Sequence, residues 1–221
     1  MCHNISVLGT DDQRKLLISM FKQGSSLVYN KGEFIIRPGE TPSSIYYICE
    51  GQVKAFNITK YGDENLLIIR KPHEIFPLIW AITGNGRNVI YQALAETKVY
   101  RIPRNDFTLF LKGNPSALYP FIDLVAEQYR IQSDRILDLE YRSVRERLAS
   151  FLLTMAKRFG KKTSDGILID VPLIQQDIAS SINSSRETTG RELGVLERKK
   201  LITVEQSLIL ITDKSGLKKL L

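Results

Sequence analysis

Between residues 26 and 103, short runs of Ile, Val, Tyr and Phe alternate with glycine-containing turns. The runs predict β-strands over the segments Glu33–Arg37, Ser44–Cys49, Gln52–Ile58, Asn65–Ile69 and Lys98–Ile102. The glycines between them recur every 7 to 12 residues, which is the spacing of a sandwich or barrel, and glycine adopts positive φ at such corners. A short helix over Asp11–Phe21, opened by the capping pair Thr10-Asp11, precedes this β-rich region.

The period of the apolar positions changes after Asn114-Pro115. From there, apolar and large residues step alternately by four and three, at Leu118, Ile122, Val125, Tyr129, Gln132, Ile136 and Leu139. These steps are three heptads of a coiled-coil seam on a helix over residues 116–139. The seam could pack on the β-region of its own chain, but the strict 3.5-residue period favours pairing with a second copy.

The C-terminal third predicts a winged helix-turn-helix. A helix over Ser143–Phe159 is followed by a polar turn over Gly160–Gly166, and the segment Ile202–Ile211 has the pattern of a hairpin. Between them, Ile174, Ile178 and Ile182 are expected to line one face of a first short helix.

A second short helix follows a turn at Asn183, a residue type that tolerates the left-handed conformation. Ser185 is placed to cap this helix, and Thr189, Leu193 and Leu196 are spaced to bury one face. The opposite face then presents the candidate DNA-binding residues, which are Ser185, Arg186, Glu187, Thr188, Gly190 and Arg191. Arginine can bridge guanine O6 and N7, and a carboxylate can accept from cytosine N4, so this face suits a major groove better than a merely solvated helix start.

The charge distribution agrees with a polyanionic partner for the C-terminal part. Residues 142–221 contain 15 Lys and Arg against 9 Asp and Glu, so they account for +6 of the net charge of +7. No apolar run is long enough for a membrane span, and Met1–Asn4 lacks the start of a secretory signal, so we expect a cytoplasmic protein without membrane contact.

Few residues are available for metal or catalytic chemistry. Two cysteines and two histidines exclude a disulfide scaffold, a four-cysteine iron–sulfur site and a zinc site. His73 is interpreted as a turn residue rather than a haem ligand. The sequence contains no nucleophile-elbow, Walker or dinucleotide motif, so we expect no catalytic residues and no enzyme.

Two stretches resemble the CRP/FNR family of bacterial regulators. Ser185–Arg191, with its Arg-Glu and following Arg, is similar to the start of the family's recognition helix, and Val144–Leu153 is similar to the first helix of its DNA-binding domain. Asp165–Asp170 resembles the nitrogen-control branch of cyanobacteria. The resemblance implies an α+β chain with a β-roll effector-sensing domain of the cyclic-nucleotide-binding kind (residues 1–115), a dimerisation helix (116–141) and a winged helix-turn-helix (142–221).

The resemblance also implies an effector site, from which this chain departs in part. Arg87-Asn88 falls at the family's phosphate-binding pair, and Gln132 and Ser133 align with helix positions that meet the base. Where the family has the glutamate that holds a ribose, this chain has Leu78, whose side chain accepts no hydrogen bond. We therefore expect a small anionic effector (a cyclic dinucleotide, a cyclic nucleotide or a dicarboxylate), with cyclic AMP in the family's usual pose excluded.

The sequence thus predicts a homodimeric transcription regulator that binds a pseudo-palindromic site in double-stranded DNA, with RNA polymerase as a further candidate partner. One alternative remains open: Arg87 is an ordinary loop arginine, and the chain is a ligand-independent DNA-binding protein whose β-roll is only structural.

Overall fold

The computed structural model describes residues 8–221, so the inferences on Met1–Asn4, Cys2 and His3 fall outside the described residues. Two compact units make up the chain. The first contains the residues up to Val53 together with Arg70–Gln132, and the second contains Lys54–Ile69 together with Ser133–Leu221. In the described part, no helix is both long and apolar enough to cross a membrane.

The first unit is a β-roll. One sheet has the strand order β1 (Ser25–Tyr29), β8 (Thr97–Pro103), β3 (Ser44–Glu50) and β6 (Ile75–Phe76). β2 (Phe34–Ile36) pairs antiparallel with β7 (Ile90–Ala93). The β3 strand is apolar along most of its length, and its central residues are buried in the core.

Glycine is required at one corner of this roll. Gly51 follows β3 with φ +86°, and a Cβ built on it would lie 2.4 Å from the carbonyl oxygen of Glu96. No side chain fits there, and L-residues disfavour that φ. Gly32, Gly39 and Gly62 also have positive φ, as their spacing in the sequence predicted.

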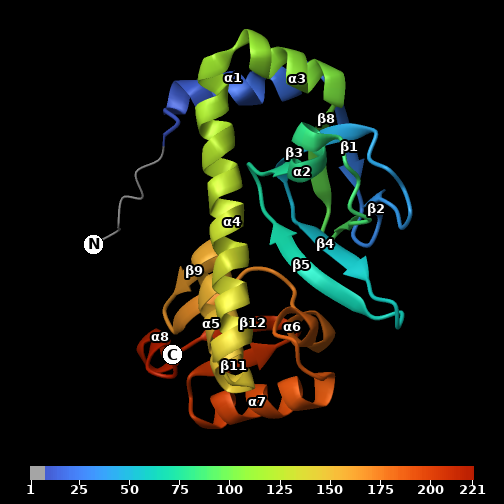
Figure 1. Ribbon diagram of the computed structural model, residues 1–221. Helices are drawn as coiled ribbons and strands as arrows, with labels where there is room; N and C mark the ends of the chain where they lie inside the picture. Colours follow the sequence, from blue (N-terminus) through green and yellow to red (C-terminus); the bar gives the residue numbers. More distant parts are fainter. Residues whose placement is uncertain (1–7) are drawn as a thin grey trace. The chain divides into compact units, whose positions relative to one another are not determined.

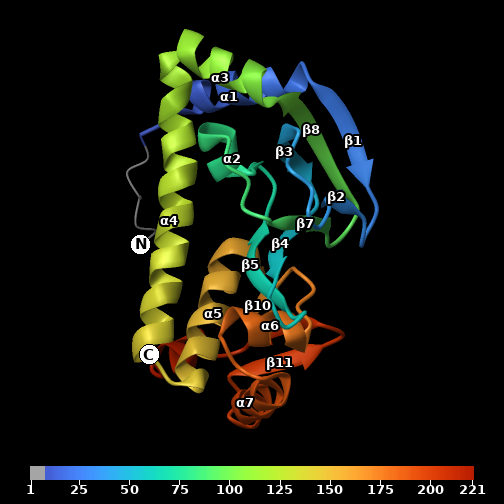
Figure 2. The same ribbon diagram turned by 45° about the vertical axis from the view of Figure 1, so that its right-hand side comes forward.

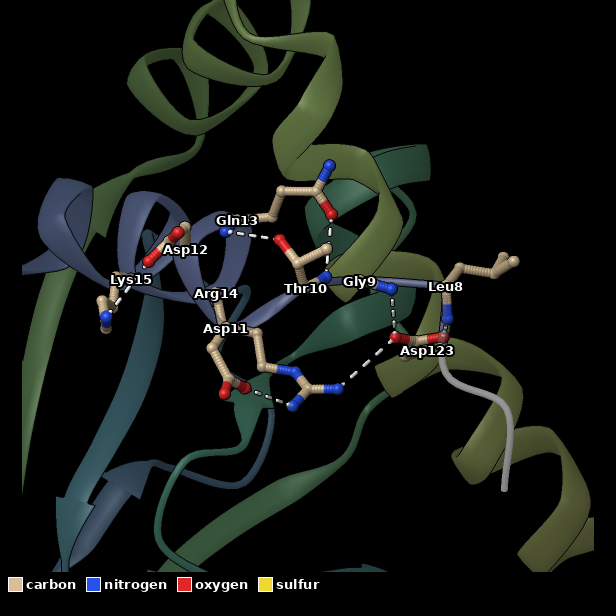
Figure 3. A network of polar contacts seen from close by, with 9 residues as sticks. All are labelled: Leu8, Gly9, Thr10, Asp11, Asp12, Gln13, Arg14, Lys15 and Asp123. Atoms are coloured by element: carbon tan, nitrogen blue, oxygen red, sulfur yellow. Dashed lines mark hydrogen bonds and ion pairs between the residues drawn. The ribbon is translucent and has the colours of Figure 1, made fainter. Parts of the chain in front are cut away.

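Helices close one end of the roll. They are α1 (Asp11–Lys22), α2 (Leu78–Thr83), α3 (Arg104–Gly113) and the 3-10 turn η1 (Pro115–Ala117). The predicted cap of α1 is present, because the Thr10 side chain accepts from the Gln13 backbone and the Gln13 side chain accepts from the Thr10 backbone. Asp123 accepts hydrogen bonds of 2.9 Å from the backbone N–H groups of Leu8 and Gly9, and these residues lie close together in Figure 3.

One continuous helix, α4 (Leu118–Tyr141), follows these elements (Figure 1). The predicted helix, 116–139, is therefore confirmed within two residues. Most apolar members of the predicted seam are exposed in the single chain: Leu118 37%, Ile122 45%, Val125 42%, Tyr129 74% and Ile136 62%. Only Pro120 and Phe121 are buried on this helix.

The second unit combines a hairpin with a winged helix-turn-helix. Its elements are β4 (Val53–Ile58), β5 (Glu64–Arg70), α5 (Val144–Phe159), β9 (Gly160–Thr163), β10 (Gly166–Ile169), α6 (Gln175–Ser181), α7 (Arg186–Arg198), β11 (Ile202–Glu205), β12 (Leu208–Ile211) and α8 (Lys214–Lys218). β4 and β5 are hydrogen-bonded neighbours, and the C-terminal sheet has the order β11-β12-β10-β9. Ser143 and Glu146 form a capping box at the start of α5.

The predicted fold class is confirmed, with two local corrections. The segment Gly160–Gly166, predicted as a polar turn, contains strand β9 and leads into β10, because β10 offers it a backbone partner with Thr163 opposite Gly166. Ile174 does not line the first short helix: it is 51% exposed and precedes α6, while Leu173 is buried instead. Strands β1, β6, β7 and β10 were not predicted.

Candidate nucleic-acid interface and effector site

The α6–α7 pair has the geometry of a helix-turn-helix (Figure 2). Asn183 occupies the turn with φ 49°, as predicted for a residue that tolerates the left-handed conformation. Ala179 is completely buried, and its carbonyl accepts the backbone N–H of Ser184 at 3.0 Å. The Ser185 hydroxyl then accepts from the Thr188 N–H at 3.1 Å, which confirms Ser185 as the cap of α7.

The two faces of α7 differ sharply in exposure. Thr189, Leu193 and Leu196 are buried, as predicted. Arg186, Glu187 and Arg191 are exposed at the N-terminal half of the helix, and Thr188 and Gly190 are half-buried. The first turns of α7 therefore present two cations and one anion to the surroundings.

Glu187 lies where a carboxylate is favoured in its ionised form. Hydrogen bonds from its own backbone N–H and from the Ser185 hydroxyl lower the pKa of Glu187 below its ordinary value. The positive charge of the neighbouring Arg186 also lowers this pKa, while desolvation acts against the shift. An ionised Glu187 is a hydrogen-bond acceptor only, and accepting is the role that a cytosine amino group requires.

Two arginines of α5 contact α7 and the turn that precedes it, and sequence reasoning did not find these contacts. Arg145 Nε donates to Glu192 on α7 at 2.7 Å, and the Glu192 side chain is only 13% exposed. Arg147 donates to the carbonyl of Asn183 in the turn at 3.2 Å. The sequence of Val144–Leu153 resembles the first helix of the family's DNA-binding domain. Its spacing does not indicate that Arg145 contacts a residue 47 positions further along the chain, or that Arg147 contacts one 36 positions further along.

The wing is the hairpin of β11 and β12. Glu205 pairs with Leu208, so only Gln206 and Ser207 form the loop. Both loop residues have positive φ, 46° and 71°. Positive φ at both central positions defines a type I′ turn, which favours Asn-Gly because most side chains are strained there.

We expect the Ser207→Gly variant to be more stable than the parent. Glycine removes the steric penalty of the left-handed conformation, which raises the free energy of unfolding by about 1 kcal/mol. Urea denaturation measures the difference. Ser207→Ala is the control, because alanine keeps the strained φ and brings no gain; equal stability of the two variants would contradict the turn assignment.

The candidate effector residues lie in two segments. Arg87 is exposed in the loop that leads to β7, and the Asn88 side chain accepts the Gly39 N–H at 3.3 Å. Gln132 and Ser133 are adjacent and half-buried on α4. Asn88 has a positive φ of 49°, so this loop turns sharply beside Arg87.

The wall of the β-roll near Arg87 contains groups that sequence reasoning missed. Tyr91 is buried, and burial raises the pKa of its hydroxyl, while the charges of Arg70 and Arg87 partly oppose that rise. Arg70 is itself buried and contacts Glu74 at 3.4 Å. Leu78 packs in the hydrophobic core with Trp80.

His73 lies in a turn and contacts a tyrosine of the β-roll. His73 has φ 71° in a turn, and its Nδ1 shares a hydrogen bond of 2.7 Å with the Tyr47 hydroxyl. The interpretation of His73 as a turn residue agrees with this geometry. Among residues 8–221, no three His, Cys, Asp or Glu side chains group to hold a metal ion.

Two family models match the chain on either side of α4. Residues 26–114 match the cyclic nucleotide-binding domain, and residues 146–220 match the Crp-like helix-turn-helix domain. The chain belongs to the CRP/FNR family. It is therefore a CRP/FNR-type DNA-binding transcription regulator with an effector-binding domain, and the family resemblance seen in the sequence is confirmed.

Relatives of this CRP/FNR chain match it along nearly its whole length. The global nitrogen regulator of Nostoc sp. is 29% identical over 90% of this chain and 93% of its own. The CRP-like cAMP-activated global transcriptional regulator of Mycobacterium tuberculosis is 25% identical over 91% and 90%. Among solved structures, the c-di-GMP responsive global regulator of Xanthomonas campestris shares the fold with a TM-score of 0.74 at 17% identity, covering 88% of this chain and 97% of that one.

Proposed function

We propose that this CRP/FNR regulator binds a pseudo-palindromic DNA site as a homodimer, with the exposed start of α7 in the major groove. The observation that carries the proposal is the division of α7 into a buried face and a face with exposed Arg186, Glu187 and Arg191. Ser185, Thr188 and Gly190 complete the contact surface. In helix-turn-helix proteins, the N-terminal residues of the second helix reach the base edges.

The exposed apolar stripe of α4 supports the proposed dimer. An exposed apolar stripe with a 3.5-residue period is unfavourable in water, and pairing with a second copy of the same helix buries it. A two-fold dimer places two recognition helices about one DNA turn apart, which matches a two-fold DNA site.

Selection from a pool of random duplexes tests this function. We expect the purified protein to enrich a site with two inverted half-sites centred about one helical turn apart. Footprinting on the enriched duplex then shows protection on one face of the DNA. A pool that stays random after repeated selection would contradict sequence-specific binding.

We also propose that the β-roll binds a small anionic effector. Arg87 holds its negative charge with Asn88 beside it, and Gln132 and Ser133 of α4 contact its other end. The proteins similar to this chain include a cAMP-activated regulator of Mycobacterium tuberculosis and a c-di-GMP responsive regulator of Xanthomonas campestris, and both cAMP and c-di-GMP are anions. Leu78 in place of an acceptor supports a ligand other than cyclic AMP in the usual pose, because a ribose hydroxyl would stay unpaired at a cost of about 1–3 kcal/mol.

Calorimetry of the parent and of Arg87→Ala with cyclic AMP, cyclic di-AMP and 2-oxoglutarate checks this proposal. We expect one of the last two to bind the parent, and the Arg87→Ala change to weaken it by about 1.5–3 kcal/mol, the value of a hydrogen bond to a charged group. Arg37→Ala, another exposed arginine of the same unit, is the matched control. Tight cyclic AMP binding by the parent would refute the exclusion, and no binding of any of the three would favour a structural β-roll.

A further inference from the structure

The β4–β5 hairpin is attached to the first helix of the helix-turn-helix by a buried ion pair. Lys54 on β4 places its ammonium 2.8 Å from the Asp177 carboxylate on α6, and it also contacts Glu64 on β5. The Lys54 and Asp177 side chains are each only 6% exposed. The hairpin belongs to the segment matched by the cyclic nucleotide-binding model, whereas Asp177 belongs to the helix-turn-helix match.

Further hydrogen bonds of the second unit surround this pair. The backbone N–H of Leu66 on β5 donates to the Ser180 hydroxyl on α6 at 3.1 Å. Arg135 on α4 donates both to the Leu66 carbonyl at 2.9 Å and to the Ser180 carbonyl at 3.2 Å. Arg158 on α5 donates to the Ile69 carbonyl at 2.8 Å. We call Lys54, Leu66, Arg135, Asp177 and Ser180 the hairpin dock.

The charge state of Lys54 agrees with a stable ion pair. Burial acts to lower the pKa of Lys54, but the hydrogen bonds and charges of Asp177 and Glu64 outweigh it, so the pKa is raised above its ordinary value. Removing Lys54 would take this ion pair away from the Asp177 carboxylate, which is only 6% exposed, and proteins tolerate such a buried charge poorly. The ammonium also lies 4.7 Å from the centroid of the Phe56 ring, which adds a cation–π contact.

The dock acts on the recognition helix through a short connection. Asp177 and Ser180 are on α6, and only Ile182–Ser185 separate α6 from α7. The connection is fixed by the Ser184 N–H donating to the Ala179 carbonyl and by the Ser185 cap. Any change in the position of α6 is therefore passed to the residues at the start of α7.

We propose that Lys54 is a positioning residue for DNA recognition, which acts through Asp177 to hold α6 and thereby sets where the exposed start of α7 lies. Lys54 is buried and does not itself reach DNA. The hairpin continues along the chain into the first unit at both ends, at Val53 and at Arg70. This inference rests on the proposed function, because it assigns a positioning residue to the helices proposed to read DNA.

The test compares three variants of the full chain. Lys54→Met breaks the pair, and Lys54→Met with Asp177→Asn removes both charges, so that no unpaired buried charge can unfold the protein. Lys60→Met is the matched control, because Lys60 is an exposed lysine on the same hairpin. The measurements are the ratio of affinities for the selected site and an unrelated duplex, hydrogen exchange of the α6 amides, and urea unfolding.

We expect the affinity ratio of the double variant to fall about tenfold or more, with faster exchange in α6, while Lys60→Met behaves as the parent. A merely stabilising role would lower the unfolding midpoint and leave the affinity ratio of the folded protein unchanged; that result would overturn the inference. A parent protein without preference for any duplex would instead refute the proposed function. Hydrogen exchange needs no DNA, so unchanged α6 exchange in the double variant would overturn the inference in that case too.

Discussion

We expect the Val125→Glu variant to sediment as a monomer at micromolar concentration, and the parent to sediment as a dimer. Val125 is 42% exposed in the middle of the apolar stripe of α4. In a two-fold pair, position 125 of one helix faces the same region of its partner, so two carboxylates would be brought together in an apolar seam. Sedimentation velocity measures the assembly state.

Loss of the dimer also removes most of the specific DNA affinity. A monomer occupies one half-site, and the second half-site no longer benefits from the effective concentration that the linked partner provides, so we expect a loss of about 10²-fold or more. Ala126→Glu introduces the same carboxylate at an exposed neighbouring position outside the predicted seam. A dimeric Val125→Glu protein, or a monomeric parent, would show that α4 is not the dimerisation helix.

We expect the Arg191→Ala variant to lose preference at one base pair in each half-site. Arg191 is exposed on the face of α7 opposite the buried Leu193 and Leu196, and an arginine fork can bind guanine O6 and N7 together. Truncation to alanine should therefore weaken the free energy of binding to the selected site by about 1–3 kcal/mol and change binding to unrelated duplexes little. Arg186→Ala is expected to act in the same way at a different base pair.

The Lys199→Ala variant distinguishes base recognition from non-specific electrostatic attraction to phosphates. Lys199 is exposed at the C-terminal end of α7, away from the proposed base contacts. Its loss should weaken all duplexes alike and reduce the salt dependence of binding by about one phosphate contact. If Arg191→Ala shows this uniform behaviour instead, or binds the selected site like the parent, the recognition-helix assignment is wrong.

Local chemistry in the sequence was enough to predict the elements that position the DNA-binding face. The cap at Ser185, the left-handed turn at Asn183 and the spacing of Thr189, Leu193 and Leu196 depend on neighbours within one or two helical turns. The period of α4 was visible for the same reason. The DNA-contact and effector residues themselves stay predictions, because exposure alone does not show what a side chain binds.

Contacts between distant segments were not predictable from the same patterns. Strand β9, Gly160–Thr163, has a polar composition, and it is a strand because β10 pairs with it. Arg145 and Lys54 appear as ordinary surface cations in the sequence, but the fold brings them to Glu192 and Asp177. Periodicity reports which face of an element is buried, and it carries no information about which distant partner a charged side chain meets.

The hairpin dock bears on how regulators of this kind can be recombined. A chimera that joins the β-roll of this chain to the helix-turn-helix of a relative, cut at the end of α4, would separate Lys54 from Asp177 although both halves keep their own cores. In such a hybrid, the ammonium of Lys54 would face a helix that was not selected to provide a carboxylate for it. Grafting the helix-turn-helix domain together with residues 54–69 transfers Lys54 along with Asp177. The part of this protein that must be moved to transfer DNA recognition therefore consists of two separate segments of the sequence.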